Sequence, residues 1–368
     1  METPLEVFPH PKLALLLQPR AGLRLFTGQD VSLYSSARAA LCHALRGLSP
    51  LAGGIAWMPS WHCGVEVQAA LDAGLDVGFY RVRCDQHIDL EDLERKLTGR
   101  PGPVLMIHYF GFGSTDIDSV SALCRRSGCM WIEDCAHALF SRRGARELGA
   151  SAPISIYSLR KSLPVFDGGA LRINCALHGF KPPPRGHRSA APYKRCLKTV
   201  ARDLVGPRLT AFYHELRWGP PADLAELPPP DLGRDSESGA RMSRLSQRLA
   251  CAVDPASVIL NRRLNWIELA SRLCDWRPVF RELGEDVCPL AFPIRVRDRR
   301  GLSRELLARG IEPYVFGAFP HPRLEESLSR DSRPLRDEIL CLPVHQEMTG
   351  ADIERLCSVM STLKRFAS

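Results

Sequence analysis

The sequence predicts an α/β fold with a mainly parallel central sheet, followed by a smaller C-terminal α+β domain. Short apolar runs alternate with helical segments between residues 55 and 132, an order typical of βαβ units. The chain has 368 residues, which is longer than one typical domain, and its 45% hydrophobic content is enough for a large core. We therefore expect a large domain over residues 1–178, a proline-rich and basic excursion over 179–240, and a helix with the smaller domain over 241–368.

Hydrophobic periodicity and helix-start signals predict the elements of the large domain. Ser35 and Ser36 precede an alanine-rich segment at 37–41, which places hydroxyls at a helix N-terminus. Further helices are expected at 65–71, from residue 90 onward and at 117–126, alternating with strands at 55–58, 77–80, 104–109 and 129–132. Because ligands bind at the carboxyl ends of the strands in such sheets, functional residues should gather there.

The excursion begins where proline clusters break any long helix, at residues 182–184, 220–221 and 228–230. A helical stretch between 191 and 213 has a basic face, formed by Lys194, Arg195, Lys198 and Arg202. This face could be a solvated surface, or it could capture a phosphate-bearing substrate or a partner subunit.

The C-terminal part predicts a long helix from Arg241 toward Asp275 and then an α+β segment. Its expected pieces are strands at 290–296 and 340–344, helices at 302–309 and 351–363, and an extended stretch at 313–316.

The charge balance favours small anionic substrates over nucleic acid. The chain carries 49 Lys and Arg against 41 Asp and Glu, a formal charge of +8, but its acids are spread throughout.

The longest apolar run, Leu13–Leu17, is far too short to cross a membrane. The 13 cysteines are an odd number, no signal peptide opens the chain, and Cys124, Cys129 and Cys135 lack zinc-knuckle spacing. We expect free thiols, no metal site and a cytoplasmic protein.

A lysine and an aspartate carry the most specific chemistry. Lys161 lies before the turn Gly168-Gly169, and Asp134 ends the apolar segment that contains Trp131. An amine that can form an imine, and a carboxylate that keeps a ring nitrogen protonated, are what a protein needs to hold pyridoxal phosphate (PLP). Each residue alone has an ordinary interpretation, since many α/β proteins end a strand in Asp and a lysine beside an arginine is usually on the surface.

Phosphate is best held at a helix N-terminus, where free backbone amides and hydroxyls converge. Ser35 and Ser36 fit this role, although a plain N-cap would have the same sequence.

In combination, several motifs resemble the DegT/DnrJ/EryC1/StrS family of PLP-dependent aminotransferases, over residues 31–175 and 289–363. The matching segments are Tyr34–Leu41, Pro59-Ser60, His108–Gly111 with Asp116–Asp118, Ile132–Ala138, Lys161 with Gly168-Gly169, Gly310–Glu312 and Leu342–His345. The resemblance implies the type I fold of PLP-dependent transferases, like that of aspartate aminotransferase.

Residue by residue, the resemblance implies Lys161 as the imine lysine and Asp134 as the partner of the pyridinium nitrogen. It places His137 near the ring hydroxyl, and Ser35 and Ser36 in the phosphate-binding turn.

Three positions depart from the family pattern. Trp61 and His62 lie in the segment that supplies the ring stacked on the cofactor, but the usual aromatic position falls at Cys63. The phosphate-binding serine, Ser158, lies three residues before the lysine instead of five. Many members also have an Asn before an Arg-Met pair, whereas Gly239-Ala240 precedes Arg241-Met242 here.

The resemblance implies an aminotransferase in which Lys161 also serves as general base. We expect glutamate as the amino donor, a ketosugar carried on a nucleotide as the acceptor, and a homodimer whose active site both subunits close. The region 185–202 is expected to line the acceptor pocket. Amination of a non-sugar ketone in secondary metabolism, and a regulatory protein that kept the fold but lost turnover, are the alternatives. Relatives that dehydrate sugars replace the lysine by His, so Lys161 argues against that branch.

Overall fold

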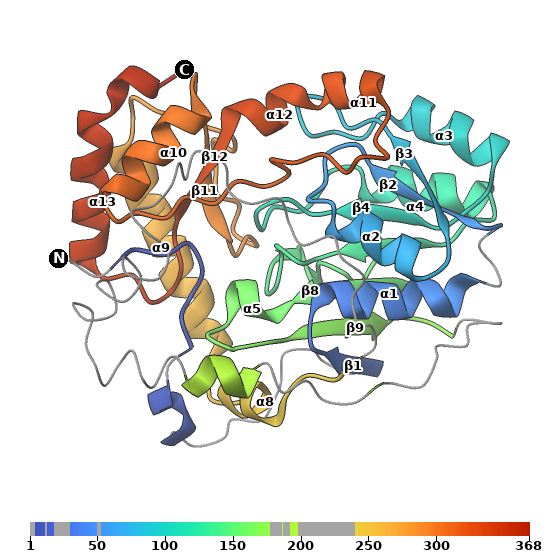
Figure 1. The fold of residues 1–368 in the computed structure, drawn as a ribbon, viewed down its shortest axis with the longest axis horizontal. Coiled ribbons are helices and arrows are strands. Elements are labelled where there is room, and N and C mark those ends of the chain that lie inside the picture. The colour runs from blue at the N-terminus through green and yellow to red at the C-terminus, as the bar shows by residue number, and fades with distance from the viewer. Residues whose placement is uncertain are drawn as a thin grey trace.

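A seven-stranded sheet forms the centre of the molecule in a computed structural model, which describes residues 4–11, 13–17, 30–49, 53–176, 186, 192–197 and 240–368. The strand order is β1-β9-β8-β5-β4-β2-β3 (Figure 1). The strands are β1 (Asp30–Tyr34), β2 (Ile55–Pro59), β3 (Asp76–Tyr80), β4 (Val104–Ile107), β5 (Trp131–Asp134), β8 (Ile154–Ser158) and β9 (Gly169–Ile173). All neighbouring strands pair in parallel except β9, which is antiparallel to both β8 and β1. The predicted mainly parallel sheet is confirmed.

Helices cover this sheet as the alternating pattern predicts. They are α1 (Ala37–Leu48), α2 (Val65–Asp72), α3 (Leu90–Gly99), α4 (Ile117–Arg126) and the single turn α5 (Leu159–Ser162). Helix α1 begins at Ser36, whose Oγ accepts a hydrogen bond from Ala39 N at 3.0 Å, and its small residues pack against β8 and β9. The short hairpin β6 (Arg142–Arg143) and β7 (Arg146–Glu147) lies outside the main sheet.

Two predicted strand boundaries were wrong. The strand expected at 129–132 is β5, which begins only at Trp131, because Cys129 N donates to Cys124 O and so completes the turn after α4. The strand expected at 104–109 ends at Ile107. Beyond it, Phe112 N donates to Tyr109 O, and Phe110 adopts a positive φ of 56° in the resulting turn.

The C-terminal elements form a smaller lobe around a three-stranded antiparallel sheet, β10-β11-β12. These strands are β10 (Arg277–Pro278), β11 (Ala291–Arg295) and β12 (Ile339–Pro343), and the helices are α10 (Arg299–Ala308), α11 (Glu326–Asp331), α12 (Arg333–Glu338) and α13 (Gly350–Thr362). Helices α8 (Arg244–Ala250) and α9 (Pro255–Arg272) connect it to the large sheet (Figure 1). Two 3-10 helices, Leu13–Leu17 and Lys364–Phe366, lie near the chain ends.

The prediction of one long helix from Arg241 toward Asp275 was wrong. The helical structure is interrupted between α8 and α9. There Asp254 accepts hydrogen bonds from Ala256 N and Ser257 N, and Pro255 occupies the first position of α9. An N-cap followed by proline starts a new helix, since proline has no N–H to donate to the preceding turn.

The segment 4–11 packs on the small lobe rather than on the large sheet. Leu5 N donates to Gly310 O and Glu312 N donates to Leu5 O, each at 2.8 Å. The division into domains at 178 and 240 stays a prediction. Residues 192–197 are helical, whereas Lys198, Arg202 and the remainder of the helix expected at 191–213 lie outside the described residues. Within the described part of the chain, no helix is long and apolar enough to span a membrane.

Candidate active site

Lys161 lies in the single turn α5, which directly follows β8. Leu163 N donates to Leu159 O at 2.8 Å and closes this one turn of helix. The Nζ atom of Lys161 lies 2.8 Å from His137 Nε2 and 3.4 Å from Tyr314 Oη. Burial lowers the pKa of Lys161, opposed by the acidic groups Cys63, Asp134 and Glu66 and assisted by Arg160.

Asp134 ends β5 at the carboxyl edge of the sheet, as predicted, and only 3% of its surface is exposed. Its Oδ1 accepts a hydrogen bond from Ala136 N at 2.8 Å, and no other described residue donates to this carboxylate. Burial and the charge of Glu66 raise the pKa of Asp134 to about 7, although Ala136 N and Lys161 oppose the shift. One carboxylate oxygen is therefore open to a ligand that carries a proton.

His137 lies in the turn after β5 and faces Lys161. Its ring stacks on Phe110 at a centroid distance of 5.7 Å, and its Nδ1 accepts a hydrogen bond from Phe110 N at 3.4 Å. Burial, together with the positive charge of Lys161, holds the pKa of His137 well below its ordinary value. The imidazole is therefore neutral at physiological pH.

Ser35, Ser36 and Ser158 come together at the N-terminus of α1. Gly169 pairs with both Tyr34 and Ser158, and Gly168 N donates to Ser35 O at 2.9 Å. The Ser36 hydroxyl caps α1, while no described residue bonds the hydroxyls of Ser35 and Ser158. The free amides at the N-terminus of α1 lie beside Ser35, so this helix end is suited to an anion.

Trp61 and His62 are packed into the interior. Trp61 stacks on Tyr109 with centroids 4.3 Å apart. The His62 ring lies 2.9 Å from Pro59 O through Nδ1 and accepts a hydrogen bond from His321 N through Nε2. These contacts give both side chains a structural role, and their contact with a cofactor stays a prediction.

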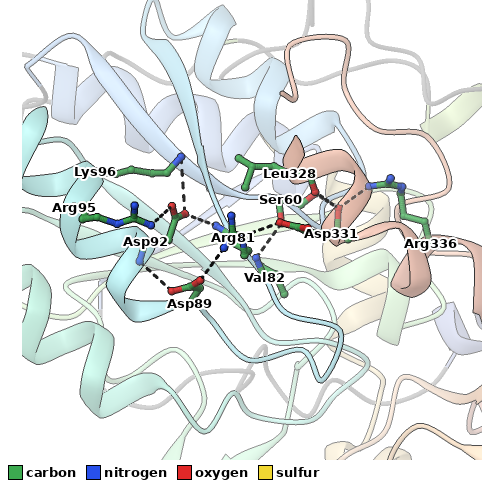
Figure 2. Close-up of polar contacts among 11 residues, drawn as sticks. Ser60, Arg81, Val82, Asp89, Asp92, Arg95, Lys96, Leu328, Asp331 and Arg336 are labelled. Atoms are coloured by element: carbon green, nitrogen blue, oxygen red, sulfur yellow. Dashed lines mark hydrogen bonds and ion pairs between the residues drawn. The ribbon is translucent and has the colours of Figure 1, made fainter. Parts of the chain in front are cut away.

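A polar network holds the chain just before Trp61 against the small lobe (Figure 2). Ser60 Oγ accepts a hydrogen bond from Val82 N, and Ser332 Oγ, between α11 and α12, donates to Ser60 O. Arg81 adds an ion pair with Asp331 at 2.8 Å. The small lobe is therefore fastened to the carboxyl ends of β2 and β3.

Sequence reasoning missed three residues around the lysine. Glu66, in the first turn of α2, is 6% exposed and accepts the Cys63 thiol at 3.1 Å. Tyr314 comes from the small lobe, and Arg262, from α9, donates to Lys161 O and Ser162 O. An acidic residue within the apolar run 65–71 was a usable signal for Glu66. Tyr314 lies in an ordinary strand-like pattern and Arg262 in an ordinary helical one, and neither pattern gave a signal that the residue belongs to the site.

Comparison with known proteins shows that part of the large lobe matches a known family. Residues 23–175 match the DegT/DnrJ/EryC1/StrS aminotransferase family. This match confirms the predicted resemblance, and its limits enclose Ser35, Asp134, His137 and Lys161.

The curated relatives of this DegT/DnrJ/EryC1/StrS region match over part of their length. A UDP-4-amino-4,6-dideoxy-N-acetyl-beta-L-altrosamine transaminase of Campylobacter jejuni is 34% identical over 110 residues, 29% of this chain and 29% of its own length. A GDP-perosamine synthase of Vibrio cholerae is 25% identical over 143 residues, 38% of this chain and 39% of its own. The matched region thus spans well under half the length of either relative.

Solved structures match over nearly the whole chain. PseC of Helicobacter pylori, an aminotransferase involved in the biosynthesis of pseudoaminic acid, has a TM-score of 0.66 at 16% identity, covering 98% of this chain and 99% of its own. A DegT/DnrJ/EryC1/StrS aminotransferase of Brucella abortus has a TM-score of 0.63 at 18% identity, covering 91% and 86%. The predicted type I fold of PLP-dependent transferases is confirmed.

Proposed function

We propose that the protein is a PLP-dependent aminotransferase that moves an amino group from glutamate to the keto group of a nucleotide-linked sugar. The observation that carries this proposal is the proximity of the Lys161 amine to the end of β5: its Nζ lies 2.8 Å from His137, which follows Asp134 in the next turn, and Lys161 and Asp134 each shift the pKa of the other. PLP requires these two groups at opposite ends of one pyridine ring.

The residues present fit this cofactor. Asp134 has one oxygen that accepts no hydrogen bond from a described residue, which suits the protonated ring nitrogen. The hydroxyls of Ser35 and Ser158, beside the N-terminus of α1, suit the phosphate. When bound, the cofactor supplies an aldehyde that condenses with amines and a ring that accepts electrons from the adjacent carbon.

Lys161 has two tasks in this reaction. Its lowered pKa leaves part of the population as the free amine, which is the form that bonds to a carbonyl carbon. Once the amino donor has displaced it, the same amine acts as general base toward the proton on the donor's α-carbon. Neutral His137, 2.8 Å from Nζ, keeps the amine in place for both tasks.

The choice of a nucleotide-linked sugar rests on the relatives, whose names refer to UDP- and GDP-linked sugars. The formal charge of +8 favours an acceptor that carries phosphate groups.

A homodimer in the cytoplasm is part of the proposal. The exposed apolar residues Leu260, Leu264 and Ile267 form one stripe on α9 that a second copy would cover. All thirteen cysteines are unpaired, as in a reducing compartment.

Borohydride trapping tests the cofactor assignment. The purified protein should be yellow and lose its colour on addition of glutamate, and reduction should leave one pyridoxyl group on the peptide that contains Lys161. Lys161→Ala should carry none, whereas Lys364→Ala, at an exposed lysine, should be labelled like the wild type. A pyridoxyl adduct that persists in Lys161→Ala would refute the assignment.

Product analysis tests the reaction and the acceptor. Glutamate with a panel of nucleotide-linked ketosugars should give 2-oxoglutarate over many turnovers. A protein that holds the cofactor without turnover would be the regulatory alternative, and turnover only with non-sugar ketones would redirect the acceptor class.

A further inference from the structure

We propose that Tyr314 is a positioning residue for Lys161, so that the small lobe takes part in holding the reactive amine. The proposal rests on the function proposed above. Tyr314 Oη lies 3.4 Å from Lys161 Nζ and 3.1 Å from His137 Nε2, and those two nitrogens are 2.8 Å apart. The three polar groups therefore form a closed triangle, with His137 from the large lobe and Tyr314 from the small one.

Tyr314 is held firmly enough to define a position. Its backbone N–H donates to Cys341 O and its carbonyl accepts from Cys341 N, each at 2.9 Å, which fixes it to β12. Phe8 packs edge-on against its ring at a centroid distance of 5.1 Å. The location of the hydroxyl is thus set by the small sheet and the N-terminal segment.

The hydrogen bond to His137 Nδ1 determines which atom carries the proton. Because Phe110 N donates to Nδ1, the neutral ring must carry its proton on Nε2. That N–H lies within hydrogen-bond distance of both Lys161 Nζ, which accepts it when the amine is neutral, and Tyr314 Oη. The amine's own hydrogens then point elsewhere, and Tyr314 Oη is the acceptor within reach.

Several titratable groups surround the amine and set the baseline for a pH test. They are Arg160 on α5, Cys63 and Glu66 at the start of α2, Asp134 on β5, and His137 and Tyr314 themselves. Only the last two contact Nζ directly among the described residues. Removal of the Tyr314 hydroxyl therefore removes one contact to Nζ and one to His137 Nε2, with no change in net charge.

The test is the capture of PLP by the full-length, cofactor-free protein over a range of pH. The rate is followed by absorbance, and the product is trapped with borohydride and located by peptide mass. In Tyr314→Phe the ring packing is kept, but the plateau rate should fall about tenfold, the effect of losing one orienting hydrogen bond.

The pH midpoint of PLP capture distinguishes the loss of a positioning hydrogen bond from a general loosening of the pocket. A hydrogen bond to an ammonium is stronger than one to a neutral amine, so loss of the Tyr314 acceptor should move the midpoint to lower pH. A loosened pocket would admit water and move it to higher pH, because burial is the main cause of the lowered pKa of Lys161.

Tyr80→Phe is the matched control. Tyr80 is fully buried, whereas Tyr314 is partly buried, and the Tyr80 hydroxyl donates to Leu105 O at 2.7 Å, away from the lysine. This variant should melt at a lower temperature yet capture PLP like the wild type.

Failure of the Tyr314 role and failure of the proposed aminotransferase function give different results. A Tyr314→Phe plateau within about twofold of the wild type, or a midpoint that rises, overturns the positioning role. Absence of any adduct on Lys161 in the wild type overturns the proposed function instead.

Discussion

Adjacent acidic residues at the end of β5 have opposite environments. Glu133 accepts hydrogen bonds from His108 Nε2 and from the amides of Ser151 and Ala152. Although burial opposes ionisation, these donors lower the pKa of Glu133. Asp134, on the other face of the strand, has one donor and a raised pKa. The sequence places both carboxylates at a strand end, but only the count of donors shows that Glu133 is structural and that Asp134 is available to a ligand.

Asp134→Asn should change how the stability of the cofactor-free protein depends on pH. The pKa of Asp134 is raised from 3.8 to about 7, so between these values the unfolded chain releases a proton that the folded chain retains. Stability from this group is therefore fully present below pH 4 and is lost as pH rises toward 7, at about 1.4 kcal/mol per pH unit. The variant should lose less stability across this window in urea unfolding. An identical pH dependence in the two proteins would contradict the raised pKa.

Glu66→Gln serves as the companion variant. Removing this negative charge should lower the pKa of Asp134, so the loss of stability should end at a lower pH. Glu94→Gln, at an exposed acid paired with Arg126, should leave the pH dependence unchanged.

At the scale of elements, the strands with apolar sequences were predictable and those completed by distant partners were not. The runs at 55–58 and 77–80 are apolar enough to be recognised as β2 and β3. No strand was predicted at β1, β8 or β9, since all three contain polar residues that interrupt the apolar pattern. Arg172 in β9, for example, pairs with Glu147 at 2.8 Å. Such a contact becomes visible only in three dimensions, so pattern analysis treats the segment as loop.

Gly169→Ala should destabilise the turn that brings the serines together. A Cβ at Gly169 would lie 2.2 Å from the carbonyl carbon and oxygen of Ser36 and 2.4 Å from Ala37 N, so backbone would have to move. We expect a loss of about 1–3 kcal/mol in denaturant unfolding, typical of overpacking, together with weaker PLP retention. Gly99→Ala, where a Cβ meets nothing within 4 Å, is the control and should be neutral. Equal free energies of unfolding for the two variants would show that the backbone around Gly169 can move to accept a Cβ without loss of stability.

At the scale of the whole molecule, the site draws on parts of the chain that sequence patterns do not connect. The motifs before residue 170 gave Lys161, Asp134 and His137, because those residues follow strands of one sheet and so share its edge. Tyr314 reaches the same point from the small lobe, across 153 positions of sequence. Which face of that extended segment turns toward the lysine depends on how the two lobes dock, and no local pattern encodes this.

Arg262 is the clearest link between the lobes. It is 1% exposed on α9, and its guanidinium donates to the carbonyls of Lys161 and Ser162 on one side and of Pro289 and Leu290 on the other. Burial lowers the pKa of this guanidinium below its ordinary value, but the group remains a cation at neutral pH. One side chain thus satisfies carbonyls in the turn that carries Lys161 and in the segment that leads into β11.

Arg262→Met should therefore cost stability and disturb the lysine together. Loss of a buried donor that serves several carbonyls leaves those acceptors unpaired, for which we expect about 3 kcal/mol or more in denaturant unfolding. Arg272→Met, on the same helix but paired with Glu354 at the surface, should unfold close to the wild type. PLP capture at Lys161, measured under conditions in which both variants are folded, should slow only in Arg262→Met, because only there does the backbone of α5 lose a fixed donor. If Arg262→Met unfolds earlier but captures PLP at the wild-type rate, the role of Arg262 is limited to stability.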